Sequence, residues 1–88
     1  MRIEFARRFL KDLEKIKTPK QRQAISEIIE QVSKIDSFKK IPSLKKLVGF
    51  EDAYRIRVGQ LRIGVFFDGE TVLFARIANR KDIYRIFP

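Results

Sequence analysis

The stretch YRIRVGQLRIGVFF, residues 54–67, decides the fold of this chain. Apolar residues occupy every second position on both sides of Gly59-Gln60, which is the alternation of two β-strands with one buried face. A glycine at the first central position is what a two-residue type II′ hairpin turn prefers. This turn places Arg57 opposite Arg62, so we expect the arginines to share the face that the apolar residues leave free.

A third strand is predicted after the turn at residues 68–70, where apolar residues continue through residues 72–77. A three-residue loop sets Arg62 opposite Arg76 in the next strand. A two-residue loop would instead bury Arg76, and an unpaired buried charge is strongly destabilising. We therefore expect Arg57, Arg62 and Arg76 to form a row across three adjacent strands.

The residues before this meander predict a short strand at residues 2–5 and two helices. Apolar residues take helical spacing from about Ala6. Thr18 and Pro19 mark the start of the second helix, along which apolar residues recur at i, i+3, i+4 and i+7.

The segments between and after these elements carry weaker patterns. Residues 36–53 are expected to form a basic loop, and residues 82–86 a short extended tail. The predicted fold is therefore α+β, a single domain over residues 1–88 with the order β-α-α-β-β-β. A helical hairpin covers one face of a mainly antiparallel sheet.

The composition narrows the chemistry that the chain can perform. Its 88 residues include 20 Lys and Arg against 11 Asp and Glu, a net charge of +9, with no Cys and no His. Disulfides, Cys/His zinc sites, thiol nucleophiles and Ser-His-Asp triads are excluded. No apolar run approaches the roughly 20 residues of a membrane span, and charges interrupt the first residues. We expect a cytoplasmic protein whose partner is a polyanion.

The predicted arginine row indicates where that polyanion binds. Like charges directly opposite each other on a sheet cost about 0.2–1 kcal/mol per pair, so stability alone does not favour the row. Arginine binds phosphate bidentately, and bases stack on rings such as Phe66, Phe74 and Tyr84. Gly64 leaves bare backbone for a close approach. A solvated strand face and a dock for an acidic protein stay open as alternatives.

Four motifs resemble the RelE branch of the RelE/ParE toxin superfamily. They are Leu44–Gly49 (LKKLVG), Tyr54–Gly59 (YRIRVG), Leu61–Ile63 (LRI) and Ile77–Arg85 (IANRKDIYR). The resemblance covers essentially the whole chain. It implies the toxin of a type II toxin–antitoxin pair, which cleaves mRNA in the ribosomal A site without a metal or other cofactor. A ribose 2′-hydroxyl would attack the adjacent phosphate. The implied partners are an antitoxin protein, mRNA on the ribosome with 16S rRNA contacts, and operator DNA through the antitoxin only.

The resemblance also implies roles for individual residues. Catalytic roles fall on Arg57, Arg62, Arg80 and Tyr84. RNA binding is expected at Arg55, which matches a basic strand position of the family. From the arginine row and the charges and rings near it, RNA binding is also expected at Arg76, Lys45, Lys46, Phe66, Phe74 and Lys81. Arginine is a poor general base near neutrality, because its pKa lies far above neutral pH and the guanidinium keeps its proton. The proton acceptor is left open among Tyr84, Glu51, Asp52, Lys45, Lys46, Lys81 and groups of the ribosomal RNA.

Two other functions are compatible with the same fold. One is a ParE-like toxin that poisons DNA gyrase and cuts no RNA. The other is a module that binds RNA or an antitoxin and has lost catalysis.

Overall fold

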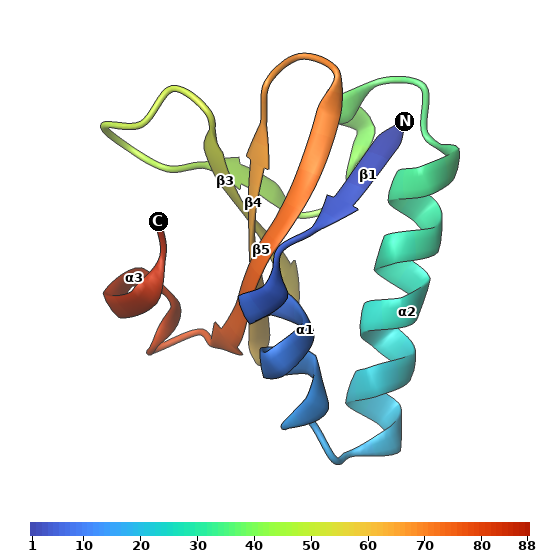
Figure 1. Ribbon diagram of the computed structural model, residues 1–88, viewed down its shortest axis with the longest axis vertical. Helices are drawn as coiled ribbons and strands as arrows, with labels where there is room; N and C mark the ends of the chain where they lie inside the picture. The colour runs from blue at the N-terminus through green and yellow to red at the C-terminus, as the bar shows by residue number, and fades with distance from the viewer.

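The computed structural model describes residues 1–88 and shows a five-stranded sheet with helices on both faces (Figure 1). The elements are β1 (Arg2–Phe5), α1 (Arg7–Glu14), α2 (Pro19–Lys34), a 3-10 helix (Phe38–Lys40), β2 (Leu44–Lys46), β3 (Ala53–Val58), β4 (Leu61–Phe67), β5 (Thr71–Asn79) and α3 (Ile83–Ile86). The strand order is β1-β5-β4-β3-β2, and only the β1–β5 pair is parallel. The predicted α+β class is confirmed. None of the helices is both long enough and apolar enough to cross a membrane.

The main core lies between the sheet and the pair formed by α1 and α2. Phe9 of α1 and Ile25 and Val32 of α2 are fully buried against the sheet. These residues belong to the apolar stripe that the helical spacing predicts. The start of α2 is confirmed at Pro19, although Thr18 makes no side-chain capping hydrogen bond.

The β3–β4 hairpin has the predicted register throughout. Arg57 lies opposite Arg62, and Arg55 lies opposite Gly64. The alternation of this segment allows only one choice of buried face, because a shift by one residue would bury the arginines.

The predicted β4–β5 register is wrong, and the turn explains why. Phe67 pairs with Val72, so the loop is one residue longer than expected. The Asp68 carboxylate accepts the main-chain N–H groups of Glu70 and Thr71, both at 2.9 Å, and so stabilises this longer turn. The extra residue exchanges the two faces of β5.

A β-bulge then exchanges the faces a second time. Val65 pairs with Phe74 and Gly64 with Arg76, which leaves Ala75 without a partner. Phe74 precedes the bulge and keeps the face set by the longer turn, so it lies in the core and is fully buried. Arg62 lies opposite Ala78 instead of Arg76, so the predicted three-arginine row is wrong in its third member.

Arg76 is held at the edge of β5 by Asp12 of α1. Its Nε and Nη2 donate to the two carboxylate oxygens at 2.8 and 3.2 Å, and this hydrogen bonding raises the pKa of Arg76. The N–H of Ile77 donates to the same carboxylate at 2.9 Å. The β1–β5 pairing ends at Phe5–Phe74, so Asp12 takes the place of a strand partner beyond it.

Two segments predicted as loop and tail are ordered elements instead. Residues 36–53 contain the 3-10 helix and β2, which adds a fifth strand next to β3. Residues 82–86 turn back as α3, and Ile83 and Phe87 pack on the outer face of the sheet. Their partners are Leu47, Ala53 and Ala75.

Gly64 makes this packing possible. A Cβ at this position would lie 2.5 Å from the ring of Phe87. The group that approaches the bare backbone closely is therefore a side chain of the same protein.

Candidate functional site

A cluster of arginines lies on the outer face at the end of the β3–β4 hairpin. It consists of Arg55, Arg57, Arg62 and Arg80, and we call it the arginine cluster. Partial burial lowers the pKa of Arg62, and the charges of the other three arginines lower it further. The three other guanidinium groups therefore lie within electrostatic range of Arg62: Arg57 is its cross-strand partner, and the N–H of Arg80 donates to Gln60 O in the hairpin turn at 3.0 Å. Of the predicted arginine set, the structure brings these four together and leaves Arg76 out.

The cluster is fixed by main-chain carbonyl groups. Arg62 Nη1 donates to Gly59 O at 2.8 Å and to Leu61 O at 3.0 Å. Arg55 Nη1 donates to Ser43 O at 3.1 Å. Two arginines are thus held by neutral acceptors, which orient the guanidinium groups without cancelling their charge.

No carboxylate pairs with the arginine cluster. The ion pairs of the chain are Lys34–Glu30, Lys40–Asp36, Arg76–Asp12 and Arg85–Asp82. A group of like charges without a counter-ion attracts an anion, and guanidinium geometry suits phosphate.

Tyr84 and Lys45 border the cluster. The charge of ionised Tyr84 would raise the pKa of Arg62, so the phenol lies within electrostatic range of it. Lys45 lies directly opposite Arg55 across the β2–β3 pair. Tyr84, Lys45 and Lys46 also line a groove of about 620 Å³ between the β2–β3 loop and α3. We call this the tail groove; its other lining residues are Leu47, Val48, Phe50, Phe87 and Pro88.

The remaining predicted RNA-binding residues lie in different environments. Phe74 packs against Phe5 and Phe9 in the main core, so its predicted role on the surface is wrong. Phe66 is half-buried, with its ring centre 5.0 Å from that of Phe87. Lys81 is exposed next to Arg80 in the turn after β5.

Two residues that border the site were missed by sequence reasoning. Val48 and Phe50 flank Gly49 in the β2–β3 loop and line the tail groove. The available signal was a pair of large apolar residues in an otherwise basic and polar segment.

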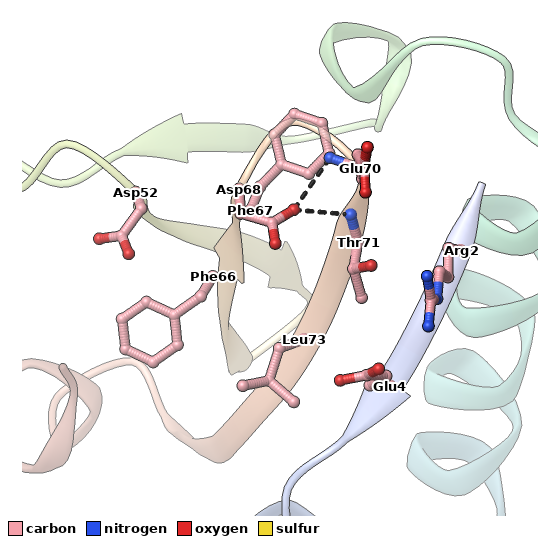
Figure 2. Close-up of a pocket in the computed structure, with 9 residues that line it drawn as sticks. All are labelled: Arg2, Glu4, Asp52, Phe66, Phe67, Asp68, Glu70, Thr71 and Leu73. Atoms are coloured by element: carbon pink, nitrogen blue, oxygen red, sulfur yellow. Dashed lines mark hydrogen bonds between the residues drawn. The ribbon is translucent and has the colours of Figure 1, made fainter.

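A cavity of about 340 Å³ at the opposite end of the sheet has the reverse charge. Figure 2 shows Arg2 and Glu4 on β1 beside Thr71 and Leu73 of β5, with the Asp68 carboxylate accepting hydrogen bonds from the N–H groups of Glu70 and Thr71. Asp52 also lines this cavity. Its four carboxylates against one arginine make it unsuited to phosphate.

Comparisons with known proteins agree with the resemblance seen in the sequence. The model of the family described as the ParE toxin of the type II toxin-antitoxin system parDE matches residues 3–84. Toxin RelE3 of Methanocaldococcus jannaschii is 39% identical over 89 residues, which covers 100% of both chains.

Solved structures place the fold in the same group. The crystal structure of the RelB-RelE antitoxin-toxin complex from Methanococcus jannaschii matches with a TM-score of 0.82 at 39% identity. The match covers 97% of this chain and 99% of that chain. The archaeal RelE-RelB complex from Pyrococcus horikoshii OT3 shares the fold, with a TM-score of 0.71 at 16% identity over 93% and 97% of the two chains. The chain therefore belongs to the RelE/ParE superfamily of toxins of type II toxin–antitoxin systems.

Proposed function

We propose that this toxin is a ribosome-dependent endonuclease that cuts mRNA in the ribosomal A site. A ribose 2′-hydroxyl gives up its proton and attacks the adjacent phosphate, and a 2′,3′-cyclic phosphate forms. The bond to the 5′ oxygen of the next nucleotide breaks, and that oxygen takes up a proton to leave as a 5′-hydroxyl. The observation that carries the proposal is the arginine cluster without a carboxylate partner. Ribosomes as the site of action would place the toxin in the cytoplasm.

The arginine cluster supplies what this reaction needs most. In-line attack builds negative charge on the phosphoryl oxygens, and donors that are already oriented stabilise it without further reorganisation. Arg62 is oriented by two carbonyl groups before any substrate binds. Loss of one such donor typically lowers the rate by about 10²–10³. We assign Arg57, Arg62 and Arg80 to this role, and Arg55 to binding the RNA backbone.

The proton of the 2′-hydroxyl needs an acceptor, which the guanidinium groups do not provide. Tyr84 and Lys45 are the titratable groups that border both the arginine cluster and the tail groove. Asp52 lines the acidic cavity instead. Tyr84 and Lys45 are therefore the first acceptors to test.

We further propose that a cognate antitoxin neutralises the toxin. Related toxins from Methanococcus jannaschii and Pyrococcus horikoshii OT3 are described in complexes with RelB. An acidic segment of the antitoxin laid over the arginine cluster would block RNA and cancel the uncompensated charge. Operator DNA would be bound through the antitoxin.

The test is brief expression of the toxin followed by mapping of mRNA ends on ribosomes. The wild-type protein should give cuts in phase with the codons. Arg62→Ala and Arg80→Ala should remove them. Arg8→Ala, which alters an exposed arginine of α1 that has no ion-pair partner, is the matched control and should leave them unchanged. Cuts that persist in both cluster variants would rule out the proposed role of the arginines.

A ParE-like poison of DNA gyrase is the second candidate. The family model described as a ParE toxin supports it, as does the absence of histidine as a ready general base. Double-strand breaks in DNA together with intact mRNA would identify this activity. A protein that causes neither toxicity nor cuts would be a binding module without catalysis.

A further inference from the structure

The tail groove gathers most of the large apolar side chains that the molecule exposes. Val48 is 94% exposed, Tyr84 58% and Phe50 48%. The other two such side chains, Phe5 and Leu10, belong to β1 and α1. Three apolar or aromatic groups gathered in one groove indicate a binding surface.

Both walls of this groove are held in place by the fold. On the loop side Leu47 is buried, its N–H donates to Ala53 O at 2.9 Å, and the N–H of Phe50 donates to Leu47 O at 3.4 Å. Gly49 has a φ of 87°, a conformation that favours glycine and turns the chain between Val48 and Phe50. On the other side, the buried ring of Phe87 anchors the tail that carries Tyr84. The backbone that carries the apolar groups is therefore held in place on both sides of the groove.

The charge around the groove points to a nucleic acid. Lys45 and Lys46 are among its lining residues, and no Asp or Glu side chain is. Lys45 lies opposite Arg55, so the positive potential continues from the groove into the arginine cluster. Aromatic rings beside a cationic track are the arrangement that binds single-stranded nucleic acids, where bases stack and phosphates pair with cations. The groove volume of about 620 Å³ falls within the roughly 300–1,000 Å³ of ligand pockets.

We propose that the tail groove binds the unpaired base of a nucleotide adjacent to the phosphate held by the arginine cluster, with Phe50 as the residue that selects the base. This inference rests on the proposed function, because it names the part of the RNA that the same site recognises. Phe50 and Tyr84 contribute aromatic rings to the groove from opposite elements, and Val48 shields the stacked base from water. Stacking alone is tolerant of sequence, so selection comes from how well each base fits between the loop and the tail.

The first test measures binding of a short single-stranded RNA that carries one 2-aminopurine, a base whose fluorescence falls when it stacks. Phe50→Ala should abolish the quenching and weaken binding about 5- to 150-fold, the effect of losing one stacked base. Phe50→Tyr keeps the ring and should keep the quenching. Leu10→Ala removes a similarly exposed apolar side chain of α1 and should behave as wild type. Phe50 is half exposed, so its truncation should leave the fold intact, which matched thermal unfolding curves check.

The second test compares the positions of mRNA cuts made by wild-type toxin and by Phe50→Ala. A changed preference among codons, with cutting retained, supports the inference. An unchanged set of cut sites together with unchanged quenching overturns it and leaves the proposed endonuclease standing. If the wild-type protein cuts no mRNA but its quenching of 2-aminopurine is lost in Phe50→Ala, base binding by the tail groove is supported and the proposed endonuclease activity is wrong. If Phe50→Ala weakens only antitoxin binding, the groove belongs to a protein partner and the inference is wrong.

Discussion

Gly64→Ala is expected to loosen the tail that positions Tyr84. A Cβ at residue 64 would lie 2.5 Å from Cγ and Cδ2 of the Phe87 ring and 2.8 Å from Cδ1. The ring is 3% exposed and packs against Phe66, so it has no room to move within the cluster that it forms with Leu47, Ala53, Ala75 and Ile83. The substitution must therefore either compress the outer cluster or expel Phe87.

Either response has a similar energetic cost. Overpacking a well-packed core costs about 1–3 kcal/mol. Expelling the Phe87 ring forfeits about 1.5–3 kcal/mol of burial. Alanine itself raises the free energy of unfolding by about 0.5–1 kcal/mol, because glycine is the less favourable residue inside a strand. We expect a net loss of about 1–2 kcal/mol in the free energy of unfolding.

Urea unfolding of Gly64→Ala in two backgrounds tests this reasoning. In the wild-type background the midpoint should fall. In the Phe87→Ala background the clash is gone, so Gly64→Ala should be neutral or stabilising by up to about 1 kcal/mol. The same destabilisation in both backgrounds, or none in the wild-type background, would refute the argument that Gly64 leaves the space in which the Phe87 ring packs.

Three further predictions follow from named contacts. Asp12→Ala removes the ion-pair partner of Arg76 and the acceptor of the Ile77 N–H, at a site where the Asp12 and Arg76 side chains are 10% and 21% exposed. It should lower the free energy of unfolding, measured in urea, by about 2–3 kcal/mol. A loss under about 0.5 kcal/mol would contradict this prediction. The N–H groups of Thr71 and Glu70 lower the pKa of Asp68, so its carboxylate stabilises the fold above its unfolded pKa of about 3.9, and this contribution is lost as the pH falls through the lower folded value. The stability difference between wild type and Asp68→Ala should therefore be larger at about pH 6 than at about pH 2, and a difference that does not change with pH would contradict the turn contact. Arg62→Ala should reduce the salt dependence of single-stranded RNA binding by about 0.7 in the logarithmic slope, whereas Arg8→Ala should not; fluorescence anisotropy over a salt series measures both, and equal slopes would remove Arg62 from the RNA interface.

The pattern of residues 54–67 was sufficient to predict the β3–β4 hairpin to the residue. There, apolar and charged side chains alternate, and only one register keeps Arg57 and Arg62 out of the core. The run Val72-Leu73-Phe74-Ala75 offers no such contrast, because all of its residues are apolar. Both faces of β5 are covered in the fold, by α1 and α2 on one side and by α3 on the other (Figure 1).

The misplacement of Arg76 and Phe74 has the same origin. A longer turn at Asp68 and a bulge at Ala75 each exchange the faces of β5. Neither can be detected in the sequence from the alternation of apolar and polar residues. Asp12 could not be identified as the partner of Arg76, because the two residues are brought together only by the packing of α1 against the sheet edge.

The residues of the candidate site were likewise predictable from the sequence only in part. Arg57 and Arg62 followed from the hairpin pattern, whereas roles for Arg80 and Tyr84 came from the family resemblance. Val48 and Phe50 emerged only from the structure, since apolar residues in a loop are usually taken to be buried. Their exposure depends on the tight turn at Gly49 and on the tail that forms the opposite wall.

The central claim is that the arginine cluster promotes attack by a ribose 2′-hydroxyl on the adjacent phosphate. The most direct measurement uses ribosomes programmed with an mRNA that carries a single 2′-deoxynucleotide immediately 5′ of the mapped cut. We predict that this one substitution blocks cleavage at that phosphate while the unmodified mRNA is cut to a 2′,3′-cyclic or 3′-phosphate end. Cleavage that proceeds past the 2′-deoxynucleotide, or that leaves a 3′-hydroxyl end, would contradict the account.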